Sequence, residues 1–335
     1  MFKFSKSFER KFNKFFPASE LVQNLPYFMI FKATHWCWYN CPHCCESSDK
    51  NRSKTFIPES VVKYYVDSAL QDTKFYNNVI ITGGELMSAY EHHDINYVPN
   101  LINYITDKNI LLDLKTNGAW IEKQNLQKNI LQDLISCSNN HRPFAYQISL
   151  SLDKYHPNAL ENNYKILKEF AQNKELKQSM LFHISGFDSD KDMYEKLLLK
   201  LKNTYNISLE KTVDFTSGQL FDILNKNIFI IPSFSPAPFA NGRAKNLSEA
   251  KPTDFPQFNF LGGSPESLAL LMAFDAAGNV TLGENSGRKI TVPWRDKNNN
   301  PRPLDEIRKD LVIKTKLEEI RVKIKTLFLP NYIER

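Results

Sequence analysis

Four of the five cysteines in this 335-residue sequence stand within nine positions, in Cys37-Trp-Tyr-Asn-Cys41-Pro-His-Cys44-Cys45, and the fifth, Cys137, stands alone. Thiolates at short spacing are typical ligands of zinc and of iron–sulfur clusters. A secreted protein would instead spread an even number of cysteines along the chain as disulfides. The crowding therefore predicts a metal site in a reducing compartment, and we expect a cytoplasmic protein.

The spacing C-x3-C-x2-C places the thiolates of Cys37, Cys41 and Cys44 in one short loop. Three sulfurs can hold three corners of a cubane iron–sulfur cluster and leave the fourth iron open to an external ligand. The alternative is structural zinc, with Cys45, His35 or His43 as the fourth ligand. Zinc modules usually supply two separated ligand pairs, and the sequence has no second pair, so the spacing favours iron–sulfur and leaves zinc open.

Strand-like and helix-like segments alternate from Tyr27 onward. Repeated β–α units favour a parallel sheet or barrel, and six units within about 200 residues are too few for a complete eight-fold barrel. We therefore predict an α/β fold built on a partial (β/α)6 TIM-type barrel. The predicted strands are 28–33, 79–81, 110–114, 145–150, 180–184 and 228–231, and the predicted helices are 58–70, 97–105, 121–134, 160–172 and 193–203.

The pattern divides the chain into three parts. We predict that residues 1–27 form a basic, aromatic helical extension and that residues 28–245 form the barrel. Residues 246–335 predict an α+β cap, with a β-hairpin over 268–282 and a long charged helix over 303–327.

The cysteine loop after the first predicted strand resembles that of the radical S-adenosylmethionine (radical SAM) superfamily. Further segments match in order at the ends of later strands: Thr82-Gly-Gly-Glu85 resembles the GGE motif, and Thr116-Asn-Gly118 resembles the TNG motif. Ser149-Leu-Ser-Leu-Asp153 ends the fourth strand, and Asn241-Gly-Arg-Ala244 resembles the GRA segment of the peptide-modifying branch. The resemblance covers about residues 28–245.

The resemblance implies two cofactors, a [4Fe-4S] cluster and S-adenosylmethionine. Reductive cleavage of the sulfonium would give methionine and a 5′-deoxyadenosyl radical that abstracts hydrogen from a substrate carbon. The implied metal ligands are Cys37, Cys41 and Cys44. The implied S-adenosylmethionine contacts are His43 near the adenine, and Gly83, Gly84 and Glu85 near the methionine amino group. Ser149, Ser151 and Asp153 are implied near the ribose, and Asn117 and Arg243 complete the set; Arg243 could pair with a carboxylate.

The segment Phe274 to Glu284 resembles the hairpin of SPASM or twitch extensions, which place a cysteine nearby for an auxiliary cluster. No cysteine follows Cys137, so an auxiliary cluster there is excluded. This favours redox-neutral outcomes such as epimerisation, without excluding crosslinking, and makes Cys137 and Cys45 candidate hydrogen donors.

The resemblance favours modification of a ribosomally made peptide. The expected partners are then an electron donor such as flavodoxin or ferredoxin and a leader-peptide-binding protein. Two alternatives stay open: a radical SAM enzyme acting on a small metabolite (amino acid, nucleoside or sugar), and a non-catalytic iron–sulfur or zinc protein.

Composition excludes other classes. The net charge is +6 and the sequence has no dense basic stripe, which argues against a nucleic-acid binder. No apolar run approaches the ~20 residues of a membrane-spanning helix. Apolar residues at 42% and aromatic residues at 13% indicate a globular chain.

Overall fold

The computed structural model describes residues 27–205, 210–213, 220–225, 227–235, 238, 242–250, 259–260, 268–282 and 290–315. The helical extension expected over 1–27 lies outside these ranges, apart from its last residue. The expected C-terminal helix is helical over 304–315, and its remainder also lies outside the described residues.

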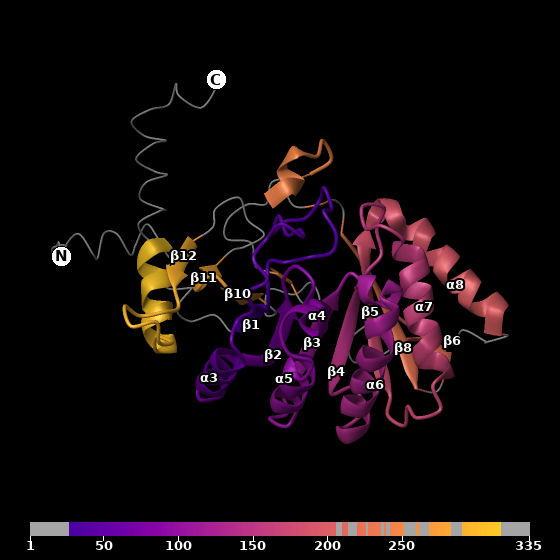
Figure 1. Ribbon diagram of the computed structural model, residues 1–335, viewed down its shortest axis with the longest axis horizontal. Coiled ribbons are helices and arrows are strands. Elements are labelled where there is room, and N and C mark those ends of the chain that lie inside the picture. The colour runs from indigo at the N-terminus through magenta and orange to yellow at the C-terminus, as the bar shows by residue number, and fades with distance from the viewer. Residues whose placement is uncertain are drawn as a thin grey trace.

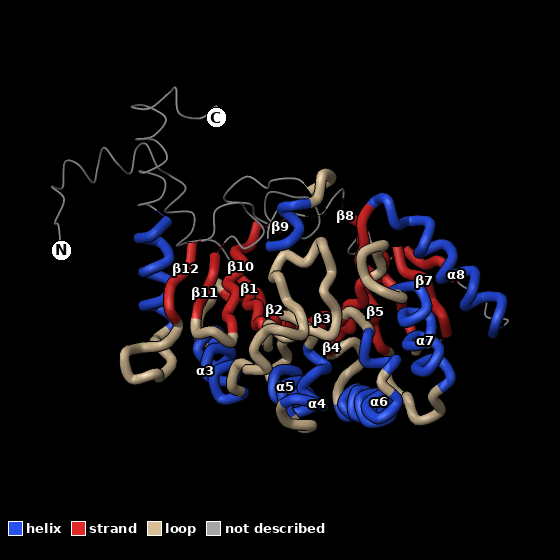
Figure 2. The backbone as a smooth tube through the Cα atoms, turned by 45° about the horizontal axis from the view of Figure 1, so that its top comes forward, coloured by secondary structure: helices blue, strands red, loops and turns tan. Residues whose placement is uncertain are grey.

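The described strands form one sheet, in the order β12-β11-β10-β1-β2-β3-β4-β5-β8-β7-β6, with β9 paired to β10. The two ends of this order do not pair with each other, so the sheet is open (Figure 2). The strands are β1 (Tyr27–Lys32), β2 (Phe75–Thr82), β3 (Leu111–Thr116), β4 (Tyr146–Ser151), β5 (Met180–Phe187), β6 (Glu210–Val213), β7 (Leu220–Asn225), β8 (Ile228–Ser235), β9 (Asn259–Phe260), β10 (Leu268–Asp275), β11 (Asn279–Leu282) and β12 (Ile290–Pro293).

The centre of the sheet is parallel, as predicted. Strands β1 to β5 and then β8 lie side by side in chain order, and every neighbouring pair among them is parallel. Strand β1 is buried along its whole length, as expected of a strand inside a covered sheet. The six predicted strands thus fall in β1, β2, β3, β4, β5 and β8.

Helices line one side of this sheet in Figures 1 and 2. Their apolar residues recur at helical spacing: α5 buries Val98, Leu101, Ile102 and Ile105 on one face. The helices are α3 (Glu59–Leu70), α4 (Ala89–His92), α5 (Tyr97–Thr106), α6 (Gln124–Asn140), α7 (Ala159–Gln172) and α8 (Lys191–Tyr205), with short 3-10 turns η1 (Leu86–Ser88), η2 (Ala119–Glu122), η3 (Asp188–Asp190) and η4 (Gly242–Asn246).

The structure differs from the sequence expectation at both edges of the sheet. Strands β6 and β7, which the sequence analysis did not predict, form an antiparallel extension beside β8. At the other edge the predicted hairpin is confirmed as β10 and β11. Strand β10 also pairs in parallel with β1, from Tyr27 opposite Leu270 to Lys32 opposite Asp275.

The described C-terminal strands are therefore continuous with the central sheet. Trp294, Leu304, Ile307 and Leu311 belong to the same buried apolar cluster as the central strands. The Tyr65 hydroxyl of α3 donates to the carbonyl oxygens of Trp294 and Arg302, each at 3.0 Å. Shared apolar burial thus stabilises the described C-terminal residues against the central sheet.

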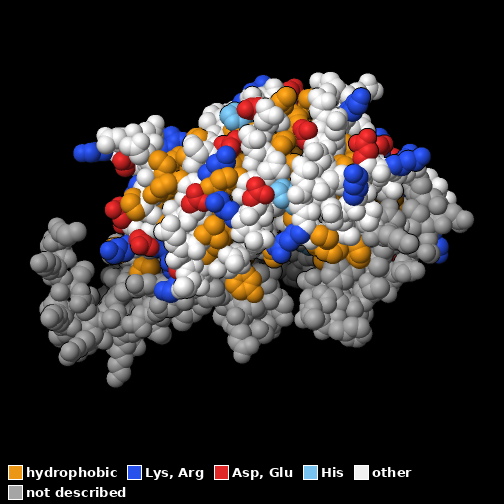
Figure 3. Space-filling view, turned by 90° about the horizontal axis from the view of Figure 1, so that it is seen from below, with side chains coloured by type: hydrophobic (Ala, Val, Ile, Leu, Met, Phe, Trp, Pro, Cys, Tyr) orange, Lys and Arg blue, Asp and Glu red, His pale blue; other side chains and the backbone are white. Residues whose placement is uncertain are grey.

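Figure 3 shows one face of the molecule, on which charged side chains of both signs lie among hydrophobic ones. On the described part of the face in Figure 3, Lys and Arg side chains are interspersed with Asp and Glu. None of the described helices combines the length and the apolar character needed to cross a bilayer.

Candidate functional site

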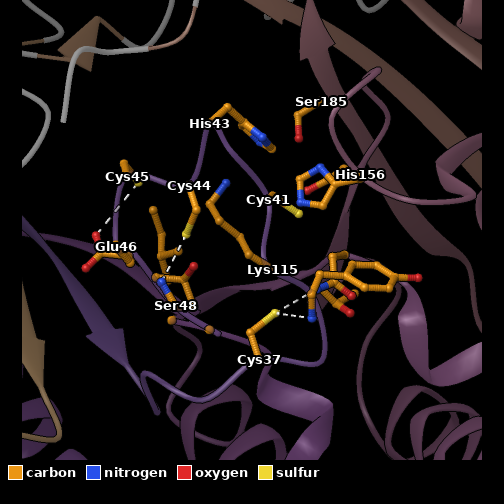
Figure 4. Close-up of a pocket in the computed structure, with 18 of the residues that line it drawn as sticks. Cys37, Cys41, His43, Cys44, Cys45, Glu46, Ser48, Lys115, His156 and Ser185 are labelled. Carbon is orange, nitrogen blue, oxygen red and sulfur yellow. Dashed lines mark hydrogen bonds between the residues drawn. The ribbon is translucent and has the colours of Figure 1, made fainter. Parts of the chain in front are cut away.

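The carboxyl ends of β1 to β5 and the loops that follow them surround a pocket of about 400 Å³ (Figure 4). Ligands of parallel α/β sheets bind at this edge because the loops between strand and helix meet there. The predicted site residues that line this pocket are Cys37, Cys41, His43, Cys44, Cys45, Gly83, Gly84, Asn117 and Ser151.

The three cysteines of the C-x3-C-x2-C spacing share this pocket, and N–H groups point at two of their sulfurs. The backbone N–H of Tyr39 and the side-chain amide of Asn117 donate to Cys37 Sγ at 3.4 and 3.3 Å. The backbone N–H of Ser48 donates to Cys44 Sγ at 3.4 Å. Donors arranged in this way stabilise negative charge on sulfur.

Burial raises the pKa of the Cys37 thiol to about 12. A thiol with such a pKa stays protonated at neutral pH unless a cation replaces the proton, and a coordinated metal does this outright. The buried sulfurs and the donors aimed at them therefore fit a metal centre, and a [4Fe-4S] cluster held by Cys37, Cys41 and Cys44 matches the donor set.

The glycine pair after β2 holds the cysteine loop against the sheet. Gly84 N donates to Thr34 O at 2.6 Å, and Glu85 N donates to Trp36 O at 2.9 Å. A Cβ on Gly84 would lie 2.0 Å from Trp36 O, and one on Gly83, whose φ is +127°, would lie 2.4 Å from Thr34 O. Only glycine allows this approach, so the pair fixes the backbone that leads directly into Cys37.

Glu85 is fully buried and binds the protein itself. Its carboxylate accepts from Met87 N at 3.0 Å, from Thr116 Oγ1 at 2.8 Å and from Asn117 N at 3.0 Å. Burial raises its pKa, although these three hydrogen bonds oppose that shift. The side chain links the loop after β2 to the loop after β3 and does not line the pocket, which differs from the methionine contact expected from the sequence.

Asn117 occupies the centre of that second loop. Its N–H is held by Glu85, its Oδ1 accepts from Ala119 N at 2.9 Å, and its Nδ2 is left to donate to Cys37 Sγ. The conformation depends on Gly118, whose φ of +76° lies in the left-handed region that favours glycine. The TNG segment thus aims an amide at the cysteine site.

On the opposite wall, His43 lies beside residues of the loop after β4. Its ring stacks on Tyr155 with centroids 4.8 Å apart, and its Nε2 is 3.7 Å from Asp153 Oδ2. Burial lowers the pKa of His43 to about 4, so its ring is neutral at pH 7. Its Nδ1 is buried without a partner among the described residues, which is a feature of a site that receives a polar ligand.

Asp153 lies behind the pocket wall and orients His156, a residue that the sequence analysis missed. Asp153 Oδ2 lies 2.7 Å from His156 Nδ1. Burial opposes the charge on His156, but this hydrogen bond and the neighbouring Cys41 outweigh it and raise the His156 pKa to about 10. His156 therefore places a cationic ring beside Cys41 in the pocket.

Arg243 does not line the pocket. It binds the back of the cysteine loop: its Nε donates to Cys41 O at 2.9 Å, its Nη2 donates to Ser48 O at 2.6 Å, and its Nη1 lies 3.3 Å from Asp49 Oδ2. The backbone N–H of Arg243 donates to Cys44 O at 3.0 Å. The guanidinium that was expected to pair with a ligand carboxylate instead fixes the shape of the loop.

Two further candidates lie away from the pocket. Ser149 donates to Asp113 Oδ1 at 2.5 Å and lies 3.2 Å from His183 Nδ1, deeper along the strands. Cys137 is buried in α6, and burial raises its pKa to about 12. The structure therefore does not place Cys137 at the pocket as a hydrogen donor, whereas Cys45 does line it.

Lys115 and Ser185 also line the pocket and were not predicted. The alternation of side chains along a strand could have found them: Lys115 stands two residues before Asn117, and Ser185 pairs across the sheet with Ser151. Lys115 Nζ lies 3.3 Å from Asp113 Oδ2, and Figure 4 shows its side chain extending toward the cysteine loop.

Comparison with known proteins finds no matching family model and no curated relative. Several solved structures match at low similarity. Streptococcus suis SuiB bound to its precursor peptide SuiA is 12% identical with a TM-score of 0.41, and the match covers 82% of this chain and 62% of SuiB. SuiB bound to S-adenosylmethionine is 12% identical with a TM-score of 0.42, covering 84% of this chain and 67% of SuiB.

HydG, a maturase of the [FeFe]-hydrogenase, is 11% identical with a TM-score of 0.34, covering 60% of this chain and 46% of HydG. This chain thus spans about two thirds or less of the length of these proteins.

Proposed function

We propose that the protein is a radical SAM enzyme. The observation that carries the proposal is the convergence of Cys37, Cys41 and Cys44 with the GGE and TNG segments on one pocket, with N–H donors aimed at two of the sulfurs. When bound, a [4Fe-4S] cluster and S-adenosylmethionine would supply the electron and the 5′-deoxyadenosyl group for hydrogen abstraction.

The chain's own residues then bind and shield these groups. The neutral His43 ring and its unpartnered Nδ1 offer a stacking surface and a polar contact to an adenine. The Gly83–Gly84 backbone and Ser151 line other parts of the same pocket. Asp153 and Glu85 do not line the pocket themselves. Asp153 holds His156 in place, and Glu85 holds Asn117 in place.

The substrate class follows from the sequence. The GRA segment around Arg243 and the hairpin of β10 and β11 resemble the peptide-modifying branch, and we propose a ribosomally made peptide as substrate. Because no auxiliary cysteines follow Cys137, epimerisation or another redox-neutral change is favoured, and Cys45 is the candidate hydrogen donor that lines the pocket. The crowded free thiols suit the cytoplasm, where we propose the protein acts.

Anaerobic reconstitution tests the activity. We expect about four irons and four sulfides per chain, and release of 5′-deoxyadenosine after addition of S-adenosylmethionine and dithionite. Cys41→Ala should abolish both, whereas Cys137→Ser, at a site remote from the pocket, should abolish neither. Zinc in place of iron, or a reduced cluster that never cleaves S-adenosylmethionine, would overturn the proposal.

The hydrogen acceptor can be followed separately. In deuterated water, epimerisation of a peptide through a solvent-exchangeable thiol incorporates one deuterium at the inverted carbon, and Cys45→Ala should prevent that incorporation while deoxyadenosine is still formed. Turnover of a free amino acid, nucleoside or sugar, with no reaction of a precursor peptide, would instead establish the small-metabolite alternative.

A further inference from the structure

The loop between β1 and α3 carries an exposed cationic edge, formed by Lys50, Arg52 and Lys54. None of these three side chains forms an ion pair with a described acidic residue. The two acidic residues of the loop are turned to other partners: Glu46 pairs with Lys32 at 2.8 Å, and Asp49 pairs with Arg243 at 3.3 Å. The cationic edge therefore keeps its positive charge toward solvent.

Two aromatic side chains lie next to this edge, the buried Trp36 and the half-buried Trp38. Lys54 Nζ lies 5.7 Å from the centre of the Trp36 ring, and the Trp36 ring meets that of Trp38 at 5.6 Å. Trp38 Nε1 donates to Glu91, whose exposed carboxylate marks the far side of the surface. The buried Trp36 ring thus supports the cationic edge from beneath.

The cationic edge is directly connected to the cysteine site. Cys37 N donates to Asp49 O at 3.2 Å, and Trp36 Nε1 donates to Lys50 O at 3.2 Å. Lys50 is thus separated from the backbone of Cys37 by one peptide unit and one hydrogen bond. The rate of electron transfer through protein falls steeply with the length of the path between donor and acceptor. A redox partner docked at Lys50 would have a short path to Cys37.

The loop is also held in a fixed shape. Arg52 N donates to Asp49 O at 3.2 Å, and Arg52 Nε donates to Ser47 O at 3.0 Å. Arg243 binds the same loop from behind through Ser48 O and Asp49. A preformed charged surface costs little ordering on binding and speeds the encounter with an oppositely charged protein.

We propose that the cationic edge of Lys50, Arg52 and Lys54 is the docking surface for a small acidic one-electron carrier protein. The inference rests on the proposed function, since the carrier's role is to reduce a cluster held by Cys37, Cys41 and Cys44. The step balances with the carrier as reductant: a flavin hydroquinone loses one electron to become a semiquinone, and the centre at the cysteines gains that electron.

Binding of oxidised flavodoxin to the reconstituted protein, measured by calorimetry, tests the surface without requiring turnover. The test variant is Lys50→Glu with Lys54→Glu, which leaves the loop contacts of Arg52 in place. The matched control is Lys174→Glu with Lys177→Glu, two exposed lysines between α7 and β5 that give the same change in net charge.

We expect the Lys50/Lys54 variant to raise the Kd for flavodoxin at least about tenfold at low ionic strength, and the difference to shrink in concentrated salt. The Lys174/Lys177 control should keep the wild-type Kd within about twofold. Deoxyadenosine formation driven by reduced flavodoxin should fall in the test variant, while formation driven by dithionite should stay at the wild-type rate.

Equal flavodoxin affinities in the wild type and the test variant, or an equal loss in the control, would overturn the docking surface. Loss of dithionite-driven activity in the test variant would show that the substitutions had damaged the loop itself, and this result would also count against the docking surface. Absence of dithionite-driven deoxyadenosine in the wild type would instead overturn the proposed function, so the two failures are distinguishable.

Discussion

Gly84→Ala should prevent the cysteine loop from holding a cluster while leaving most of the fold intact. The added Cβ would lie 2.0 Å from Trp36 O, whereas ordinary contact begins at 3.4 Å. The two backbones must therefore separate by about 1.4 Å (3.4 − 2.0). The three atoms nearest to the added Cβ, namely Trp36 O, Trp36 C and His35 C, all belong to backbone, so no side-chain rotation relieves the clash.

The cost follows from the contacts that this separation breaks. The Glu85 N to Trp36 O hydrogen bond lengthens from 2.9 Å to about 4 Å, beyond hydrogen-bond range, and the 2.6 Å bond from Gly84 N to Thr34 O lengthens with it. Two buried hydrogen bonds at ~1 kcal/mol each, together with ~1–3 kcal/mol of overpacking, destabilise the fold by about 3–5 kcal/mol.

The displacement matters more for the site than for the fold. Trp36 precedes Cys37, and metal–ligand distances tolerate only about 0.2 Å. We therefore expect Gly84→Ala to bind less than about one iron per chain after anaerobic reconstitution, under conditions where circular dichroism shows it to be folded. Urea unfolding of the metal-free protein measures the accompanying loss of stability.

Gly278→Ala provides the matched control. Gly278, in the turn between β10 and β11, has a φ of +99°, and its added Cβ would meet only the Arg295 side chain. Left-handed strain should cost about 1–2 kcal/mol without moving the cysteine loop, so its iron content should match the wild type. Full iron loading of Gly84→Ala, or equal iron loss in both variants, would refute the reasoning.

Four other substitutions test the site and the fold. Cys44→Ala should abolish iron binding and Cys45→Ala should leave it intact, as measured by iron content; the reverse result would reassign the ligands. Asn117→Ala removes a donor to Cys37 Sγ, which should destabilise the reduced, more negative cluster by ~1 kcal/mol and lower its potential by roughly 40 mV in an EPR-monitored titration without S-adenosylmethionine; an unchanged or higher potential would contradict this. Tyr65→Phe removes the hydroxyl that donates to Trp294 O and Arg302 O. The free energy of unfolding, measured in urea, should fall by about 1–3 kcal/mol. A loss below ~0.5 kcal/mol would show that the hydroxyl does not stabilise the C-terminal part.

The central fold could be predicted because local pattern decides it. Short apolar runs such as Val79–Ile81 and Ile228–Ile231 are read directly from the sequence, and the helices between them indicate that the strands are parallel. The pairing of β10 with β1 could not be predicted in this way. It joins residues far apart in the chain, and no local feature of either strand specifies the other.

The composition of the site could be predicted more fully than the roles of its members. The cysteine spacing and the glycine pair can be recognised from residue type alone, and the structure places these residues at one pocket. Glu85 and Arg243 were identified as important, but most of their partners are backbone groups whose positions emerge only on folding. His156 was missed because a histidine three residues after Asp153 has no pattern of its own until the loop brings it to Cys41.

The pairing of β10 with β1 also sets an order of events during synthesis. Leu270 is made 243 residues (270 − 27) after its partner Tyr27, an interval of about 12–50 s at ~5–20 residues per second. For that time β1 is the outermost strand of a growing sheet, with one row of backbone groups unpaired and open to wrong partners. The loop of Cys37 begins where this strand ends, so the wall beside it is completed only when Asp275 has taken its place opposite Lys32. The sheet edge beside the proposed metal site is therefore completed only late in the synthesis of the chain.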